Sequence, residues 1–503
     1  MEVPAKNMLT LPANSADKRL TRRRCLQMGL MTLGGLALRA PGAAPQRPNI
    51  LFIAVDDLRP ELGCYGREYI KSPNIDRIAR QGMTFNRAYC QQAVCSPSRS
   101  SLLTGTRPDT TKVWDLVTHF RDALPDVVTL PQLFKQGGYF VQGIGKIYHP
   151  GFDDPRSWSV PWQTPKAPTY ALLKTPEVKD EDVPPKNGKK RKGPAFESAD
   201  VPDNFFKDGK VADLAAGTLR GLSRKPEPFF FAVGFAKPHL PFVAPKKYWD
   251  LYDPAQIKLA PNPFRPKEAP EYALSNSNEL RNYEGMPAEG PIPDNLARQL
   301  KHGYYAAVSY TDAQIGKVLD ELDRLGLRKN TIIVLWGDHG WKLGEHGEWC
   351  KHSNVENDAN APLLLSVPGM KNAGKHTNAL VEFVDVYPTL SELAGMPLPG
   401  HLEGTSFKPL LDDPNRPWKT AAFSQYPRQG WMGYSMRTDR YRFTVWVGRK
   451  DHSKVDAIEL YDHQTDPQEN TNIAKLPANA ELVKRLMEQW RQGWQGANPP
   501  ATR

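Results

Sequence analysis

The stretch NILFIAVDD, residues 49–57, joins an apolar run to two adjacent carboxylates. A continuous apolar run of this kind is typical of a strand that is buried on both faces of a sheet. Other apolar runs in the chain are followed in the same way by polar, chemically reactive side chains. They are YFVQGI (139–144) before GKIYHPG, FFFAVGF (229–235) before AKPHLPF, and TIIVLW (331–336) before GDHGWKLGEHGEWCKHSN.

Helical patterns lie between these runs. Apolar residues recur at a helical period over residues 304–325, and shorter helices are predicted at 73–81 and 130–136. Strands that alternate with helices form a mostly parallel sheet with helices on both faces. Ligands bind beyond the carboxyl ends of such strands. The sequence therefore predicts an α/β fold with a large, mostly parallel central sheet, in which the four polar clusters meet at one edge.

The chain divides into segments of different pattern. Residues 47–428 form the predicted catalytic domain, with a polar insertion loop at 164–203 that is rich in Pro, Lys and Asp. That loop is either a solvated surface insertion or a patch that attracts anionic polymers. From about residue 430 the pattern changes to the short strands MGYSMRT, YRFTVWVG and IELYD, followed by a helix at 479–492. Residues 429–503 are therefore predicted to form a small subdomain with an antiparallel sheet.

Residues 1–44 have the order of an export signal. A twin-arginine pattern at 21–23 precedes a weakly apolar run at 25–38, and small residues at 40–44 offer a cleavage site. The alternative is a basic tail with an apolar patch. The apolar run is too short to span a bilayer, and no other stretch is long enough. We expect export to the periplasm or the cell exterior by the twin-arginine route, and a mature chain without a membrane span.

Composition limits the class of protein further. The 503 residues are 40% hydrophobic and 24% charged, as in ordinary globular proteins. The formal net charge is +11, and the chain stays mildly basic without the signal, which suits a polyanionic substrate. We expect no nucleic-acid partner. Cys25 lies in the signal and, if Cys95 has a chemical task, only Cys64, Cys90 and Cys350 remain, which excludes a disulfide framework.

Carboxylates follow two of the predicted strands. Asp56 and Asp57 end the first run, and Asp338 with His339 ends the fourth. Several buried acids in one place are costly unless a cation holds them. Oxygen ligands of this kind suit Ca²⁺ or Mg²⁺, although a histidine is an unusual ligand for a hard cation. The alternative for an isolated Asp-Asp pair at a strand end is a helix cap.

The stretch CSPSRSSLLTG, residues 95–105, predicts a short helix. Pro97 suits the first turn of a helix and Gly105 suits its end, so Cys95 lies at the amino terminus. Backbone N–H groups and the helix dipole make that end an anion site, and Arg99 is one turn away. A thiolate is a poor partner for oxygen ligands on a hard cation. We therefore expect that Cys95 does not act as a thiol.

The same stretch resembles the type I sulfatase signature C-x-P-x-R. Further motifs are similar to the iduronate-2-sulfatase branch of that family, and the resemblance runs over residues 47–475. These motifs are AVDDLRPELGCYG, GKIYHPG, KPHLPF, GDHGWKLGEHGEWCKHSN, SQYPR, MGYSMRT, YRFTVWVG and ELYDHQTDP. The resemblance implies an alkaline-phosphatase-like fold and a sulfuric ester hydrolase. It also implies that Cys95 is oxidised to formylglycine by a formylglycine-generating enzyme, a transient partner.

The resemblance assigns a calcium ion to the acidic residues. Asp56, Asp57, Asp338 and His339 would hold Ca²⁺ together with the modified Cys95. Histidine at position 339 is similar to the iduronate-2-sulfatase branch, where other sulfatases more often have asparagine.

The resemblance also assigns the basic residues. Arg99 and Lys146 would fix the formylglycine hydrate, and His149 would act as a base. His239 and Lys351 would bind the sulfate and assist the departing sugar oxygen. Taken singly, each histidine would more often be an ordinary structural residue, and a lysine is usually solvent-facing.

Substrate contacts are expected from Lys237 and Trp341, and packing is the alternative for Trp341. The leading hypothesis is an exported sulfatase that removes a 2-O-sulfate from a uronic acid of a sulfated carbohydrate. The alternatives are a sulfatase for another sulfated polysaccharide or choline sulfate, a phosphonate or phosphate ester hydrolase, and a catalytically dead protein that binds sulfated glycans.

Overall fold

The computed structural model describes residues 47–172 and 192–499. The predicted export signal at 1–44 lies outside this part of the chain, as does the middle of the predicted loop at 164–203. Within the described ranges, no helix has the length and apolar character needed to cross a membrane.

In the described part of the chain, seven strands form the central sheet in the order β13-β2-β12-β9-β1-β6-β3. β9, β1, β6 and β3 are adjacent and parallel to one another, and β12 runs antiparallel to both of its neighbours. This confirms the predicted mostly parallel sheet. The strands are β1 (Asn49–Val55), β2 (Met83–Tyr89), β3 (Phe140–Gly145), β6 (Phe229–Phe235), β9 (Thr331–Gly337), β12 (Leu363–Ser366) and β13 (Lys375–Glu382).

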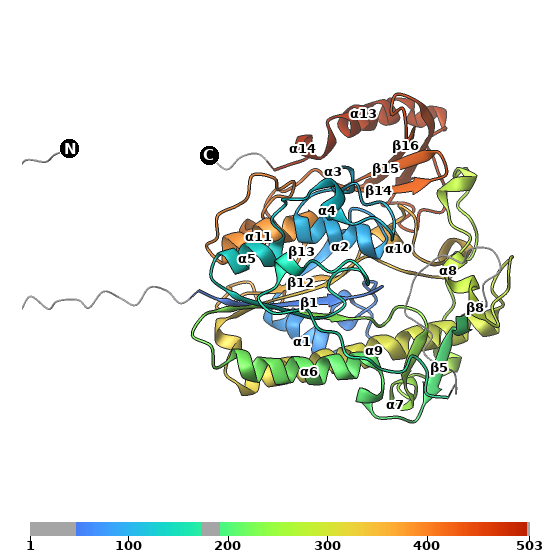
Figure 1. The fold of residues 1–503 in the computed structure, drawn as a ribbon. Helices are drawn as coiled ribbons and strands as arrows, with labels where there is room; N and C mark the ends of the chain where they lie inside the picture. Colours follow the sequence, from blue (N-terminus) through green and yellow to red (C-terminus); the bar gives the residue numbers. More distant parts are fainter. Residues whose placement is uncertain (1–46, 173–191, 500–503) are drawn as a thin grey trace, which may run out of the picture. The chain divides into compact units, whose positions relative to one another are not determined.

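Helices cover both faces of this sheet (Figure 1). β1 is buried along its whole length, with Leu51 and Ile53 in one core and Ile50 and Phe52 in the other. The Leu51 face packs on α1 (Pro73–Gln81), α6 (Lys207–Leu222) and α9 (Asp294–Arg324), and the opposite face packs on α2 (Cys95–Thr104), α5 (Leu130–Gln136) and α11 (Val386–Leu393).

Of the three helices predicted between the strands of the central sheet, two have the predicted bounds and the third is longer. α1 and α5 match, but α9 begins at Asp294 rather than at residue 304. Its first turns carry the polar and charged sequence DNLARQLKHG, so their apolar period is weak. Leu300 is nevertheless fully buried, because tertiary packing extends the helix.

A second sheet closes the chain. In residues 421–462 four strands pair in the antiparallel order β14-β15-β16-β17, and α13 (Ala480–Arg491) packs on them. The expected sheet and helix are therefore present. β14, however, belongs to this sheet although the expected boundary at residue 428 assigned it to the catalytic domain; an edge strand containing Pro427 has a weak strand pattern. The strands are β14 (Ala421–Arg428), β15 (Trp431–Thr438), β16 (Tyr441–Gly448) and β17 (Val455–Asp462).

The end of the predicted insertion loop is packed rather than solvated. Ala195, Glu197 and Ala199 are buried, and the backbone around them forms short strands. The lysine- and proline-rich composition of the neighbouring residues hid this local alternation of buried and exposed positions. The strands are β4 (Lys192–Pro194), which pairs with β8 (Tyr283–Glu284), and β5 (Phe196–Ala199), which pairs with β7 (Phe242–Pro245).

Candidate active site

Buried charged side chains gather where the parallel strands end. Asp56 and Asp57 follow β1, and Asp338 and His339 follow β9; all four are 0% exposed. The Asp338 N–H donates to the carbonyl of Val55 (3.2 Å), which joins the two strand ends. The predicted meeting of the polar clusters at one edge of the sheet is therefore confirmed for these strands.

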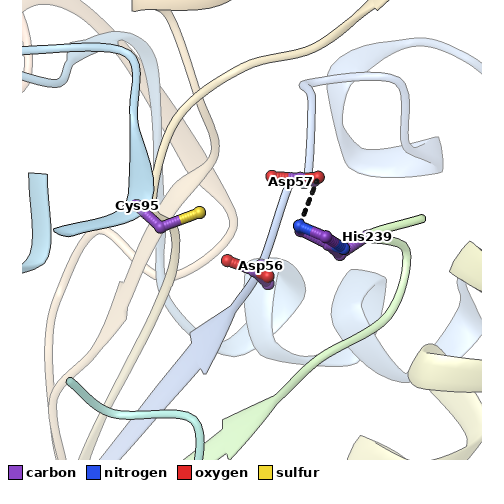
Figure 2. Close-up of side chains that lie close together, drawn as sticks. All are labelled: Asp56, Asp57, Cys95 and His239. Atoms are coloured by element: carbon purple, nitrogen blue, oxygen red, sulfur yellow. Dashed lines mark ion pairs between the residues drawn. The ribbon is translucent and has the colours of Figure 1, made fainter. Parts of the chain in front are cut away.

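Cys95 begins α2 at the same edge, as predicted. The helix ends at Gly105, whose φ of 69° is left-handed. The Ser98 hydroxyl in its first turn donates to the backbone carbonyl of Asp338. The Cys95 Sγ lies 3.4 Å from His339 Nε2 and points toward Asp56 and Asp57 (Figure 2). The nucleophile position predicted from the motif thus lies within the acidic cluster.

Arg99 lies behind the carboxylates and bridges them. Its Nε donates to Asp338 Oδ2 at 2.9 Å and its Nη2 to Asp56 Oδ1 at 3.1 Å. The third nitrogen, Nη1, donates to the backbone carbonyl of Lys146 at 2.6 Å. Although burial lowers the pKa of the guanidinium, Asp338 and Asp56 raise it above its usual value. Arg99 therefore fixes the orientation of two carboxylates as a permanent cation.

The two adjacent aspartates have different charge environments. The Lys146 Nζ lies 2.5 Å from Asp56 Oδ2. Burial raises the pKa of Asp56, but Lys146 and Arg99 lower it well below the usual range. For Asp57 burial dominates and raises the pKa to about 6, despite the opposing effect of Lys351. The effect of nearby cations on the pKa thus outweighs the effect of burial at Asp56, and burial outweighs the cations at Asp57.

His239 and Lys351 approach Asp57. The Lys351 Nζ is 3.1 Å from Asp57 Oδ1, and the His239 Nε2 is 3.9 Å from Asp57 Oδ2 (Figure 2). Both also contact Glu279, at 3.0 Å from Lys351 and 3.2 Å from His239. Glu279 was missed by the sequence reasoning, because it follows no buried strand and belongs to none of the quoted motifs.

The other residues that the sequence predicted for the site are Lys237, Trp341 and His149. The Lys237 Nζ donates to the backbone carbonyls of His239 and Pro241, each at 2.8 Å, and so supports the loop after β6. Trp341 is 0% exposed, which supports packing rather than the expected sugar contact. His149 is buried, with its ring 5.9 Å from Phe152, and its role as a base stays a prediction.

The buried Trp341 ring has a structural reason. It is stacked on Tyr304 at 6.4 Å and meets the edge of Phe242 at 6.2 Å. The Lys351 ammonium lies 4.9 Å from its centre. The face of the indole ring therefore stabilises the Lys351 ammonium group.

Three groups of side chains in the described part of the chain could hold a metal ion, and two of them lie at this edge of the sheet. Within each group the ligand atoms lie within 4.8 Å of one another. The two groups at this edge share Cys95, contain all of the predicted ligands and add His239 to them. They are Asp56, Asp57, Cys95 and His239, and Cys95, Asp338 and His339.

The donor set fits a hard cation, apart from the sulfur. The His339 Nδ1 lies 2.9 Å from the carbonyl oxygen of Gly340, which only accepts, so its Nε2 offers a lone pair to the cluster. Burial and the charge of Asp56 raise the pKa of the Cys95 thiol well above its usual value. A protonated thiol is a poor ligand and a poor nucleophile. An oxygen donor at position 95 would complete the set.

The fold and this site are those of a sulfatase. The family model "Sulfatase" matches residues 48–396, and the model "N-sulphoglucosamine sulphohydrolase, C-terminal" matches residues 344–495. The chain belongs to the sulfatase family, with an alkaline-phosphatase-like fold, and it is a sulfuric ester hydrolase.

Individual relatives confirm the resemblance to iduronate-2-sulfatases. The chain is 38% identical to iduronate 2-sulfatase of Mus musculus and 36% identical to that of Homo sapiens; each match covers 87% of this chain and 93% of the relative. A solved structure described as a complex with its substrate D-glucosamine-2-N,6-O-disulfate is 25% identical, with a TM-score of 0.72, over 90% of this chain and 98% of the other.

Proposed function

We propose that this sulfatase acts on a sulfated carbohydrate and removes the 2-O-sulfate of a uronic acid. The iduronate 2-sulfatases of mouse and human support the choice of substrate. The observation that carries the chemistry is the position of Cys95, whose sulfur lies 3.4 Å from His339 among buried carboxylates. A sulfated sugar also suits the mildly basic chain.

A cavity beside the site supports an anionic substrate. It has a volume of about 220 Å³ and is lined by Asp56 and His239 at the catalytic edge. Four lysines contribute to its wall: Lys146, Lys192, Lys207 and Lys237. Lysines that line a partly enclosed space attract anions more strongly than lysines in bulk water.

We further propose the cofactor and the modification implied by the family. Asp56, Asp57, Asp338 and His339 would hold Ca²⁺ together with position 95, and the ion would offset negative charge on the substrate. Oxidation of Cys95 to formylglycine would supply the nucleophile as a hydrated aldehyde. A formylglycine-generating enzyme and export by the twin-arginine route belong to the same proposal.

The basic side chains then have distinct tasks. A sulfate ester is an anion, so an attacking anion is repelled unless cations lie close to both. Lys146, with its Nζ 4.0 Å from the Cys95 sulfur, would stabilise charge at the nucleophile. Lys351 and His239 would face the leaving oxygen and supply its proton, and His149 would act as the base.

The test is sulfate release, measured by ion chromatography, from protein with a verified aldehyde and calcium. The panel holds an oligosaccharide ending in 2-O-sulfated iduronate, its glucuronate epimer, an internally sulfated polymer, choline sulfate and an aryl phosphate. We expect release from the first substrate. Release only from another sulfate would change the substrate, and phosphate release alone or no release at all would contradict the proposal.

The matched control is Cys95→Ser. A serine would form a stable sulfate ester, because it lacks the second hydroxyl that lets a geminal diol expel sulfate. We therefore expect at most one turnover per molecule in this variant. An unchanged steady-state rate would contradict the assigned nucleophile.

A further inference from the structure

Glu279 connects the cationic side chains of the site. It lies on α8 (Asn278–Arg281), in the segment between β7 and α9. Its Oε1 is 3.0 Å from the Lys351 Nζ and 3.2 Å from the His239 Nε2, and its Oε2 is 3.1 Å from the His352 Nε2. One carboxylate thus contacts the side chains of three residues. Two of them, Lys351 and His239, are the residues assigned to the leaving oxygen.

The backbone around Glu279 is tied to the strand that carries Lys351. The Ser277 hydroxyl accepts the N–H of Trp349 at 2.8 Å, and Trp349 belongs to β11 (Trp349–Cys350) directly before Lys351. Leu280 is fully buried. Side chains on a fixed backbone lose little freedom when they make contacts, so Glu279 is suited to hold its partners in place.

His352 shows how the carboxylate is oriented. The His352 Nε2 faces Glu279, which only accepts, and its Nδ1 lies 2.9 Å from the Tyr426 hydroxyl. Burial lowers the pKa of His352, so the ring is neutral, with the proton on Nε2 and the lone pair on Nδ1. Tyr426 donates to that lone pair. The Glu279 Oε2 is thereby fixed, Oε1 faces His239, and the Lys351 Nζ lies 3.0 Å from each of the two oxygens.

Lys351 has a second carboxylate partner, and that partner has another assigned task. The Lys351 Nζ lies 3.1 Å from Asp57 Oδ1, but Asp57 belongs to the candidate metal ligands. A carboxylate that binds a divalent cation interacts less strongly with a neighbouring ammonium group. Glu279 belongs to neither of the two groups of candidate ligands at this edge. It remains the counter-ion of Lys351 when Asp57 binds a metal.

We propose that Glu279 is a positioning residue, which holds Lys351 and His239 at the leaving oxygen when the acidic cluster is occupied by a cation. This inference rests on the proposed function and deepens it. Removal of one member of a buried charged network takes part of the compensation from the others. Without Glu279, Lys351 and His239 lose the carboxylate that both contact and are held less firmly at the leaving oxygen.

The proposal predicts a dependence on the leaving group. A sugar alkoxide is a poor leaving group and needs a proton, whereas 4-nitrophenolate leaves without one. Proton donation by a positioned side chain contributes about 10²–10⁴-fold. For Glu279→Gln we therefore expect kcat on a sugar sulfate to fall about 100-fold, and kcat on 4-nitrophenyl sulfate to fall by less than about tenfold.

Two further variants separate this role from a general loss of structure. Glu279→Asp keeps the charge, and we expect it to recover part of the lost rate on the sugar sulfate. Glu284→Gln removes an exposed carboxylate from β8, in the same segment, and is expected to leave both rates unchanged. Equal losses on both substrates in Glu279→Gln, or no loss on either, would overturn the proposal.

A binding measurement tests the inference independently of turnover. In the Cys95→Ser background, calorimetry compares the affinity for Ca²⁺ and, with Ca²⁺ present, for inorganic sulfate. Glu279→Gln is expected to change Ca²⁺ affinity by less than about threefold and to weaken sulfate binding at least about tenfold. Sulfate binding that is unchanged or tighter in the Glu279→Gln variant would overturn the positioning role. So would the absence of sulfate binding both with and without Glu279→Gln. Failure of sulfate release with intact sulfate binding would instead contradict the proposed function alone.

Discussion

Two clusters of acids and histidines in this molecule, one buried and one partly buried, differ in how their negative charge is compensated. One is the catalytic edge, with Asp56 and Asp57. The other lies beneath the C-terminal sheet, where Glu356, Glu469 and His463 offer ligand atoms within 4.8 Å of one another. By residue types and spacing alone, both clusters resemble metal sites.

The second cluster is compensated by arginines. The Arg442 guanidinium lies 2.5 Å from both Glu356 Oε2 and Glu469 Oε1, and Arg437 lies 3.2 Å from Glu356. Burial raises the pKa of Glu356, but these two arginines lower it to about 2. Asp57, whose side chain is fully buried where that of Glu356 is 22% exposed, has its pKa raised to about 6. We therefore expect a metal ion to bind where the cations of the protein compensate buried negative charge only in part, and not wherever acids and histidines meet.

The largest expected effect on stability comes from removing the arginine that compensates the second cluster. Arg442→Met leaves the buried Glu469 and the partly buried Glu356 without their shared partner. We expect a loss of about 3–5 kcal/mol in the free energy of unfolding, with little change in Ca²⁺ affinity. Urea unfolding monitored by circular dichroism measures the loss. A change below about 1 kcal/mol would show that the network is not the stabilising cluster we describe.

At the catalytic edge, removal of a charge is expected to increase the free energy of unfolding rather than to decrease it. The folded-state pKa of Asp57 is above that of an unfolded aspartate, so the ionised side chain destabilises the metal-free fold, increasingly from pH 4 to pH 6 and constantly above. Asp57→Asn removes that charge, and Glu279 remains to compensate Lys351. We expect the metal-free variant to be more stable by about 1–3 kcal/mol at pH 8, and to lose Ca²⁺ binding.

Glu356→Gln is the matched comparison for Asp57→Asn. It also replaces a carboxylate, here a partly buried one, by an amide, but a folded pKa of about 2 means that the charge stabilises the fold at neutral pH. We expect it to be less stable than the wild type in the same urea experiment. The comparison between the two clusters fails if both variants change stability in the same direction.

The catalytic edge is also expected to show competition between protons and calcium. Ca²⁺ requires the ionised form of Asp57, whose pKa is about 6. Affinity should therefore change little between pH 8 and pH 7 and fall by up to about tenfold per pH unit below pH 6. Calorimetry at pH 7.5, 6.5 and 5.5 measures it. Constant affinity over this range would contradict the assignment of Asp57 as a ligand.

The smallest effect is expected for an exposed ion pair. Lys246 and Asp250 lie one helical turn apart at 2.5 Å, but both side chains are 55% exposed. Water and salt screen such a pair, so Asp250→Asn should change the free energy of unfolding by less than about 0.5 kcal/mol. A larger loss would show that burial does not separate strong from weak charge pairs in this fold.

Much of the fold and site follows from the sequence because buried parallel strands leave a clear pattern. The run before Asp56 is apolar throughout, since both faces of β1 are covered, and the polar residues that follow it must lie at the sheet edge. The helix at Cys95 could likewise be predicted from Pro97 and Gly105.

Most of the missed features depend on tertiary contacts. Glu279 lies on a four-residue helix without a preceding strand, and only the fold brings it to Lys351. Trp341 stands in a motif beside the site, yet its ring is buried beneath Lys351, since sequence position does not give the direction of a side chain. The early start of α9 also results from packing partners that are distant in the sequence. β14 pairs with β15, its neighbour in the sequence, and was missed because Pro427 weakens its strand pattern.

The most direct test of the central claim is sulfate release from a 2-O-sulfated uronic acid oligosaccharide before and after chelation, with the aldehyde at position 95 verified by peptide mass. The under-compensated edge around Asp57 predicts release that stops when calcium is removed and returns when it is added back. Release that continues at the same rate without divalent cations, or none from aldehyde-bearing protein with calcium present, would contradict the account.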